Sequence, residues 1–492
     1  MSTICAISTP HGIGGIAVIR VSGDEAISIA NRLWKGKDLE QTPSHTAHLG
    51  VLVDPANGER LDEAVATVFR APASFTGEDV VELSVHGSQW IQNELVNMLI
   101  RNGCQLAEPG EFTRRAFANG KLDLTEAEAV ADVIAATSRA SNRLAQQQMR
   151  GQFSAQLGTL HDSMLELASL LELELDFSEE DVEFADRRKL LDIAETTLRT
   201  VDSLAASFAT GDAIRRGVPT AIVGAPNAGK SSVLNQLIGD DRAIVSDIPG
   251  TTRDTIEDTA DLGGITFRFI DTAGLRRTSD TIENLGIERS MAAIRRARIV
   301  LWVIDARWAA EKPEELGTIA ATIVRELPAD ARAVAVLNKT DLIGNEEQLQ
   351  SLIDSTLTAI APISTLVAIS AATQPGVPAL RTLLPSLFSL TPNINVRPKN
   401  GQTAPASNGG VFTQALLNDD QTVIVTNARH YQALLAASAS LQRVIGGLRA
   451  NLSGDLVAQD VRETLHHLSS ITGVITTPDI LATIFSRFCI GK

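Results

Sequence analysis

The spacing of apolar positions changes along the chain and divides it into regions. Up to about residue 118, short alternating runs are mixed with helical patterns and glycine-containing turns, which predicts an α+β domain. From Thr125 onward the apolar positions recur every three or four residues, and Thr125 with Glu128 matches a capping box at a helix start. A second helical stripe is expected at Leu157, Leu160, Met164, Leu167 and Leu171. The clearest strands expected in the first region are Ile16–Val21, Ala64–Phe69 and Val80–Val85.

Strands return at Val218 and alternate with helices to about Leu384, which predicts a doubly wound parallel sheet. Residues 393–410 are rich in Pro, Gly and Asn, as is typical of a linker, and helices resume after them. The sheet domain is therefore inserted between two helical halves. Neither half has an obvious second apolar surface, so we expect the two to pack into one bundle. The predicted domains are 1–118, 119–214, 215–386 and 387–492.

The segment after the expected strand Val218–Val223 has the pattern of a phosphate-binding loop. It reads Gly224-Ala225-Pro226-Asn227-Ala228-Gly229-Lys230-Ser231-Ser232, and a helical pattern follows it. Glycines let consecutive backbone N–H groups and a helix N-terminus face phosphates, Lys230 adds a positive charge, and the Ser231 hydroxyl can bind Mg²⁺. The loop therefore predicts a nucleoside triphosphate site.

Later motifs indicate which nucleotide is bound. Asp341, in Asn338-Lys339-Thr340-Asp341, can accept from the ring N–H and the exocyclic amine of guanine, whereas adenine presents an acceptor there. Ser370-Ala371 would cover the base by backbone contact. Asp271-Thr272-Ala273-Gly274 can hold Mg²⁺ through water and sense the γ-phosphate, and Thr252 offers the metal a second hydroxyl. The sequence therefore predicts GTP, not ATP.

The residue after Asp271-Thr272-Ala273-Gly274 is Leu275, where many GTPases place a glutamine that orients the attacking water. Leucine cannot orient water. Hydrolysis must therefore draw its water-positioning group and its charge-neutralising group from elsewhere in the chain or from a partner.

Composition narrows the classes of protein. Hydrophobic residues make up 44% and charged residues 21%, as in globular proteins. No apolar stretch reaches about 18 residues and the first Arg is Arg20, so we expect neither a membrane span nor a leader, and a cytoplasmic location. The net charge of −16 opposes non-specific nucleic-acid binding. Local RNA contacts, with solvated helix faces as the alternative, would involve Arg114-Arg115, Arg187-Arg188-Lys189 or Arg295-Arg296.

Several segments together resemble the tRNA modification GTPase family MnmE, also called TrmE, over the whole chain. They are Val18-Ile19-Arg20-Val21-Ser22-Gly23, Phe75-Thr76-Gly77-Glu78-Asp79-Val80-Val81-Glu82-Leu83, Pro109-Gly110-Glu111-Phe112-Thr113, Lys121-Leu122-Asp123-Leu124 and Phe488-Cys489-Ile490-Gly491-Lys492. The resemblance implies a multidomain α/β protein. It would have an α+β N-terminal domain that forms a homodimer and binds tetrahydrofolate, a helical domain that ends in a functional cysteine, and an inserted Ras-like GTPase domain.

The resemblance also implies chemistry and partners. A flavin-dependent partner, MnmG (GidA), would act with the chain to add an aminomethyl or carboxymethylaminomethyl group at C5 of the wobble uridine of certain tRNAs. The folate would be 5-formyl- or 5,10-methylene-tetrahydrofolate. Hydrolysis of GTP would use Mg²⁺ and K⁺.

The resemblance also implies roles for individual residues that match positions of the family's motifs. Arg20, Glu82, Lys121 and Lys492 match folate contacts, and Cys489 matches the functional thiol. Asn227, Ser246, Ile248 and Thr251 match the potassium site, and Glu283 matches the carboxylate that orients water, which would answer the Leu275 problem. The GTP set is Asn227, Ala228, Gly229, Lys230, Ser231, Ser232, Ser246, Asp247, Ile248, Pro249, Gly250, Thr251, Thr252, Asp271, Thr272, Ala273, Gly274, Asn338, Lys339, Asp341, Ser370 and Ala371.

Two other function classes stay open at this point. A regulatory GTPase of ribosome assembly would have a similar GTPase domain but would not predict the folate-type N-terminus or the terminal cysteine. A GTP-switched binding module would position a partner without chemistry of its own. Measuring modification of the wobble uridine in tRNA distinguishes a tRNA modification GTPase from the ribosome-assembly GTPase. The role of Cys489 distinguishes it from the binding module.

Overall fold

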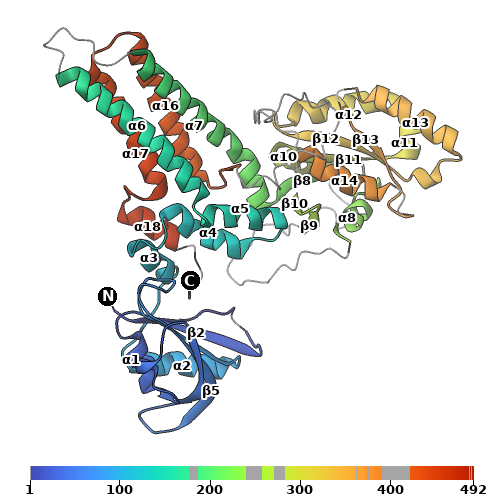
Figure 1. Ribbon diagram of the computed structural model, residues 1–492. Coiled ribbons are helices and arrows are strands. Elements are labelled where there is room, and N and C mark those ends of the chain that lie inside the picture. Colours follow the sequence, from blue (N-terminus) through green and yellow to red (C-terminus); the bar gives the residue numbers. More distant parts are fainter. Residues whose placement is uncertain are drawn as a thin grey trace, which may run out of the picture. The chain divides into compact units, whose positions relative to one another are not determined.

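The structure is a computed structural model. It describes residues 2–10, 12–176, 187–239, 258–270, 283–361, 363–373, 376–388, 422–486, 488 and 490–491, without the side chains of 174–176, 283–288 and 388. These residues form two compact units (Figure 1). Unit 1 comprises Met1–Ile134, Gln146–Thr197 and Ala439–Lys492, and unit 2 comprises Ala135–Ala145 and Leu198–Ser438.

Unit 1 contains a seven-stranded sheet in the order β3-β4-β5-β6-β2-β1-β7, antiparallel except between β1 and β7. Its strands are β1 (Ile4–Ile7), β2 (Ile16–Ser22), β3 (Trp34–Lys35), β4 (Thr46–Val53), β5 (Arg60–Phe69), β6 (Val80–His86) and β7 (Gln105–Leu106). Helices α1 (Ala26–Arg32) and α2 (Gln89–Arg101) lie against the sheet (Figure 1). Their apolar residues form one core with the strands, which includes Ile19, Leu83 and Leu95.

The predicted strands of the first region are confirmed as parts of β2, β5 and β6. Four further strands were not expected. β3 and β7 are only two residues long, and β1 is a four-residue apolar run, so none of these three is long enough to show a period.

The helices of unit 1 show how the two helical halves meet. Helix α6 (Gln152–Asp176), from the first half, packs along α17 (Gly454–Thr472), from the second. The apolar positions expected on α6 are all buried: Leu157, Leu160, Met164, Leu167 and Leu171. The prediction that the halves form one bundle is therefore confirmed. Unit 1 also contains η1 (Leu39–Gln41), α3 (Glu111–Ala118) and α18 (Pro478–Phe485).

The predicted capping box at Thr125 and Glu128 is wrong by two residues. Helix α4 (Leu124–Ala135) begins after Asp123, whose Oδ1 accepts from the backbone N–H of Glu126 at 2.8 Å. The Glu126 carboxylate accepts in return from the Asp123 N–H at 2.9 Å. Asp123 and Glu126 have the same i, i+3 spacing as the predicted pair, so the error lies in where the helix starts.

Unit 2 contains a six-stranded sheet in the order β13-β12-β11-β8-β10-β9. Its strands are β8 (Val218–Val223), β9 (Asp258–Leu262), β10 (Ile265–Ile270), β11 (Ile299–Asp305), β12 (Arg332–Asn338) and β13 (Leu366–Ala368). All neighbours are parallel except β9 and β10, which are joined by Gly263-Gly264, both with positive φ. The predicted doubly wound parallel sheet is confirmed, with an antiparallel edge strand added.

Helices cover both faces of this sheet, as its two apolar cores show. One core includes residues of α8 and α14, and the other includes residues of α10, α11 and α12. The helices of unit 2 are α8 (Lys230–Ile238), α10 (Glu283–Arg296), α11 (Ala306–Glu311), α12 (Pro313–Glu326), η2 (Thr340–Leu342), α13 (Glu346–Ala359) and α14 (Val377–Phe388). Helices α4, α5 (Arg139–Met149), α7 (Arg187–Arg216) and α16 (Ala428–Arg449) contain residues of both units.

Among the helices that the structure describes, none combines the length and the apolar character that crossing a bilayer requires. The predicted linker, residues 393–410, lies outside the described residues.

Candidate functional site

The phosphate-binding loop connects β8 to α8 at the carboxyl end of the parallel strands. Gly224 and Gly229 have φ values of 148° and 94°, and Asn227 has a φ of 63°. A Cβ on Gly224 would lie 2.2 Å from the Val303 carbonyl oxygen, and one on Gly229 would lie 2.2 Å from Nδ2 of Asn338. Both glycines are therefore required by backbone conformation and by close packing.

Lys230, the first residue of α8, folds back onto the loop. Its ammonium group donates to the carbonyl oxygens of Gly224 at 2.9 Å and Ala225 at 2.8 Å. Burial lowers the pKa of Lys230, because these contacts replace water with neutral carbonyl oxygens. An anion placed at the N-terminus of α8 would supply the negative charge that favours the protonated amine.

The Asn338 side chain joins its own segment to two others. One lies about 110 residues earlier in the sequence, and the other lies about 30 residues later. Its Nδ2 donates to the Ala228 carbonyl at 2.9 Å, and its Oδ1 accepts from the Ala371 N–H at 3.0 Å. The side chain is only 2% exposed. The phosphate-binding loop, the Asn338–Asp341 segment and the Ser370-Ala371 loop therefore form one assembly, as the motifs predict.

The Asp341 carboxylate is held by a chain of hydroxyl groups. Ser370 Oγ donates to Asp341 Oδ1, and Thr373 Oγ1 donates to Ser370 Oγ at 2.8 Å. Ser370 is fully buried. These contacts use one carboxylate oxygen of Asp341 and fix the direction of the group that is predicted to recognise guanine.

Lys339 has a positive φ of 64° and pairs with Asp305 at the end of β11, with Nζ 2.7 Å from Oδ2. Asp305 lies opposite Asn338 in the pairing of β11 with β12. Burial raises the pKa of Asp305, but hydrogen bonds from Lys339 and from the Arg307 N–H outweigh it and leave the pKa below its usual value. Sequence reasoning missed Asp305, since only strand pairing brings it beside Lys339.

Part of the predicted GTP and metal set lies outside the described residues. Ser231 and Ser232 lie in the first turn of α8, and Glu283 is the first residue of α10, where its backbone but not its side chain is described. The predicted residues outside the description are Ser246, Asp247, Ile248, Pro249, Gly250, Thr251, Thr252, Asp271, Thr272, Ala273, Gly274, Cys489 and Lys492.

A second candidate site surrounds Arg20 on β2 of unit 1. Its guanidinium carbon lies 5.4 Å from the centre of the Phe75 ring and 5.6 Å from that of Phe112. Arg20 Nε and Nη2 both donate to Oε1 of Glu82, at 2.9 and 2.7 Å. Phe75 is 37% exposed, so the group is open to solvent on one side. A cation over two aromatic rings, with a carboxylate beside it, fits a flat ligand with polar edges.

Lys121 and the chain end lie in the same unit. Lys121 Nζ donates to the Pro72 carbonyl at 3.1 Å, on the segment that leads to Phe75. At the chain end, the Gly491 carbonyl accepts from Ser8 Oγ at 3.2 Å, and a Cβ on Gly491 would lie 2.2 Å from the Ile7 carbonyl oxygen. The structure thus brings Arg20 and Glu82 into contact, whereas Lys121 contacts the neighbouring loop. The two aromatic rings were not predicted as ligand contacts.

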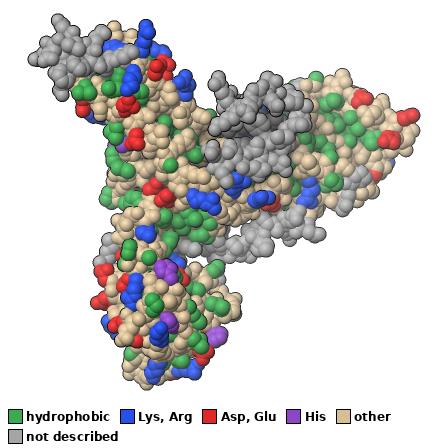
Figure 2. Space-filling view, viewed as in Figure 1, with side chains coloured by type: hydrophobic (Ala, Val, Ile, Leu, Met, Phe, Trp, Pro, Cys, Tyr) green, Lys and Arg blue, Asp and Glu red, His purple; other side chains and the backbone are tan. Residues whose placement is uncertain are grey.

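The arginines that were predicted as local RNA contacts differ in how far they are buried. Arg115 is only 5% exposed and its guanidinium is paired with carboxylates, so its assignment to an RNA surface is wrong. Arg187 is half-buried and Arg295 is exposed, and they are hydrogen-bonded to Asn451 and Glu326, respectively. On the face shown in Figure 2, Lys and Arg side chains lie interspersed with Asp and Glu.

The described residues place no group of three His, Cys, Asp or Glu side chains where they could hold a metal ion.

Comparison with known proteins follows the same division of the chain. A family model described as the MnmE helical domain matches residues 124–489, and one described as the GTP-binding protein TrmE N-terminus matches residues 3–121. The chain belongs to the MnmE family. The tRNA modification GTPase MnmE of Christiangramia forsetii is 46% identical over 498 residues, which cover 100% of this chain and 99% of that protein. The protein of the same name from Bacteroides fragilis is 47% identical over 495 residues, which cover 100% and 99%.

The two candidate sites lie in the parts of the chain that the two family models match. The TrmE N-terminal match contains Arg20, Glu82 and Lys121, and the MnmE helical match extends from α4 to residue 489, across the inserted sheet domain. The interpretation of the sequence as an MnmE family member with an inserted GTPase domain is confirmed.

Proposed function

We propose that this MnmE family member hydrolyses GTP and that hydrolysis serves the modification of tRNA. The observation that supports this best is the Asn338 junction, where one buried carboxamide joins the phosphate-binding loop to both guanine motifs. The junction lies in a chain that matches tRNA modification GTPases along its whole length. The reaction would add an aminomethyl or carboxymethylaminomethyl group at C5 of the wobble uridine, with the flavin-dependent MnmG as partner, in the cytoplasm.

Within the GTP site, the loop amides and Lys230 would bind the phosphates. Asp341, aligned by Ser370, would accept two hydrogen bonds from guanine. Ser231, in the first turn of α8, would offer its hydroxyl to Mg²⁺, with Thr252 as the second hydroxyl. Asn227, a residue of the phosphate-binding loop, would be a K⁺ ligand, with Ser246, Ile248 and Thr251 completing the set. When bound, the two cations supply charge neutralisation at the phosphates.

Glu283 would orient the water in place of the missing glutamine. Glu283→Ala is therefore expected to retain GTP affinity and to lower kcat by about 10²- to 10⁴-fold, as for loss of a positioned proton acceptor. Glu311→Ala, on the exposed surface of α11, is the matched control and should hydrolyse GTP at the normal rate. Steady-state hydrolysis and nucleotide titration measure both. A fully active Glu283→Ala would remove Glu283 from the mechanism.

The dependence on cation is a separate measurement on the unmodified protein. Hydrolysis should rise strongly with K⁺ and little with Na⁺, because Na⁺ is smaller and should fit the same oxygens poorly. Equal rates in the two salts at matched ionic strength would contradict the potassium site.

The Arg20 site would bind a tetrahydrofolate that carries one carbon, as 5-formyl- or 5,10-methylene-tetrahydrofolate. Arg20 and Lys492 suit the carboxylate tail, and Glu82 suits the N–H groups at the pterin edge. Glu82 uses one oxygen for Arg20, and its side chain is 27% exposed, so its other oxygen can face a ligand. Lys121 would contribute from the loop that it contacts.

A homodimer through the N-terminal domain is supported by the open face of its sheet. The core lies between the sheet and α1 and α2, and apolar side chains are exposed on the strands. Leu49 and Val65 lie opposite each other on β4 and β5, with exposed fractions of 68% and 36%, and Ile16 on β2 is 70% exposed. Large apolar side chains exposed on a sheet are typical of a surface that is covered by a partner. Sedimentation of the full chain tests the dimer.

The proposed function as a whole is tested in cells that lack this chain. Wobble-uridine modification in their tRNA should be absent and should be restored by the unmodified chain. Cys489→Ser should hydrolyse GTP normally and fail to restore modification. Normal modification without the chain would favour a role in ribosome assembly, and restoration by Cys489→Ser would show that the thiol has no chemical role.

A further inference from the structure

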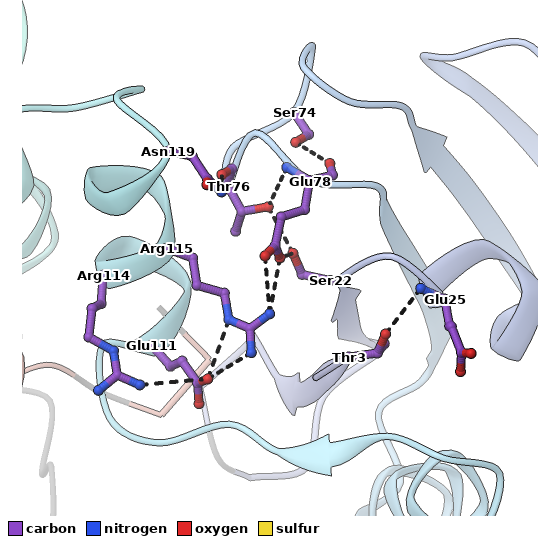
Figure 3. A network of polar contacts seen from close by, with 10 residues as sticks. All are labelled: Thr3, Ser22, Glu25, Ser74, Thr76, Glu78, Glu111, Arg114, Arg115 and Asn119. Carbon is purple, nitrogen blue, oxygen red and sulfur yellow. Dashed lines mark hydrogen bonds and ion pairs between the residues drawn. The ribbon is translucent and has the colours of Figure 1, made fainter. Parts of the chain in front are cut away.

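Arg115 on α3 lies at the centre of a buried polar network (Figure 3). Its Nη1 donates to both oxygens of Glu78 at 3.2 Å, and its Nη2 donates to Oε1 of Glu111 at 2.9 Å. The three side chains are 6%, 10% and 10% exposed. One guanidinium therefore links α3 to the segment between β5 and β6.

Further hydrogen bonds attach the same segment to β2 and to the end of α3. Ser22 Oγ donates to Oε2 of Glu78 at 2.7 Å and lies 2.8 Å from Oγ1 of Thr76. Asn119 Nδ2 donates to the Thr76 carbonyl at 2.8 Å (Figure 3). Residues 74–79 are thus tied on two sides, although they belong to neither helix nor strand.

The network buries two carboxylates against one guanidinium. Glu111 is the first residue of α3, where the helix N-terminus favours negative charge, and its Oε2 accepts from the Glu108 N–H at 2.8 Å. Burying ion pairs costs desolvation energy that their attraction often fails to recover, so such a network is weak evidence of a role in stability. A role in fixing geometry explains it better.

The network adjoins the Arg20 site through both of its aromatic walls. Phe75 precedes Thr76, and Phe112 follows Glu111, so each ring is one residue from a network member. Ser22 lies two residues from Arg20 on the same strand, and therefore on the same face of β2. The distances of 5.4 and 5.6 Å between the Arg20 guanidinium and the two rings depend on elements that Arg115 joins.

We propose that Arg115, with Glu78 and Glu111, is a positioning group that sets the two aromatic walls around Arg20 for a flat ligand with a carboxylate tail. The inference rests on the proposed binding of tetrahydrofolate at Arg20. Arg115 acts on the ligand through Phe75 and Phe112 and does not itself touch it.

The first test measures affinity for 5-formyl-tetrahydrofolate by titration calorimetry on the full chain. Arg115→Lys keeps the charge but cannot bond Glu78 and Glu111 in the same fork, and we expect about a tenfold loss of affinity. Arg101→Lys is the matched control, because Arg101 also pairs with two carboxylates of unit 1, those of Asp54 and Glu94, but on the surface. Unchanged affinity in Arg115→Lys would overturn the proposal.

A double-mutant cycle separates positioning from loss of stability. In a Phe75→Ala background, Arg115→Lys should lose the part of its effect on affinity that acts through Phe75, because that ring is gone. Fully additive losses would show that Arg115 does not act through Phe75 and would overturn the proposal. If Arg115→Lys does not fold, Glu78→Gln gives the same cycle, since it weakens the pairing with little change in volume.

Amide hydrogen exchange of the ligand-free chain tests the positioning role of Arg115 independently of folate binding. Amides of residues 73–79 should exchange faster in Arg115→Lys, and those of β2 and β6 should be unchanged. Equal protection at 73–79, or a uniform increase over unit 1, would overturn positioning by Arg115. Failure of the unmodified chain to bind the folate would instead overturn the proposed function, whatever the exchange result.

Discussion

The two candidate sites are built from different parts of the polypeptide. The nucleotide site of unit 2 is mainly backbone: glycines with positive φ, a helix N-terminus, and loop segments joined by Asn338. The Arg20 site of unit 1 is made of side chains, with two rings and an ion pair between charged groups.

This difference explains why a local motif identifies the nucleotide site, whereas Arg20 and Glu82 were assigned only through the family resemblance and the two aromatic rings were missed. Few sequences allow the backbone turns of a phosphate-binding loop, so a nine-residue motif identifies it. The members of the Arg20 site lie up to 92 positions apart, on a strand, a loop, another strand and a helix, and no local pattern joins them. A site built from backbone should therefore lose most of its ligand affinity when one glycine is replaced. A site built from side chains should lose affinity in smaller steps, one for each side chain that is replaced.

The largest expected effect is that of Gly229→Ala. The new Cβ would lie 2.2 Å from Nδ2 of Asn338 at a φ of 94°, so the loop must move away from the junction. We expect GTP affinity to fall by more than about 100-fold, because the strain and the lost contacts together cost several kcal/mol. Titration with a fluorescent GTP analogue measures it.

Gly158→Ala provides the control for that substitution. Gly158 lies within α6 and has no heavy atom within 4 Å of an added Cβ, apart from its own neighbours. We expect normal GTP affinity and a gain of about 0.5–1 kcal/mol in unfolding free energy. Comparable GTP affinities in the two alanine variants would contradict a backbone-built site.

An intermediate effect is expected from Arg20→Lys. Lysine keeps the charge but loses the planar group that contacts both rings and bonds Glu82 through two nitrogens. Affinity for 5-formyl-tetrahydrofolate should fall by about 10- to 30-fold, with GTP hydrolysis unchanged. Arg60→Lys, which alters an exposed pair with Glu63 on β5, should change neither. Equal folate affinity in both variants would remove Arg20 from the site.

The smallest effect is expected from Asp305→Asn. The pKa of Asp305 is lowered, so its ionised form stabilises the folded state above the unfolded pKa of about 4, and this contribution disappears as pH falls through the folded value. Asparagine still caps α11, so the variant should lose less than about 1 kcal/mol at pH 7, and this loss should shrink as pH falls below about 4. Denaturant unfolding at pH 7 and at a series of lower pH values measures it, and a difference that does not shrink as pH falls would rule out the charge as the cause.

The limits of sequence prediction are clearest on α3. Arg114 and Arg115 are consecutive and were assigned together to a possible RNA surface, yet their side chains are 44% and 6% exposed. Consecutive helical residues point in directions about 100° apart, so one faces water while the other faces Glu78. Only tertiary packing decides which. By contrast, the buried stripe of α6 follows directly from its helical spacing, and its position was predicted correctly.

Unit 1 is assembled from three separate stretches of chain, and this order matters while the protein is being made. Helix α6 leaves the ribosome roughly 280 residues before α17, against which it packs, or tens of seconds earlier at about 5–20 residues per second. During that interval Leu157, Leu160, Met164 and Leu167 have no α17 to cover them, while unit 2 is synthesised. The insertion of one domain into another therefore makes nascent α6 a ready substrate for chaperones that bind exposed apolar helices.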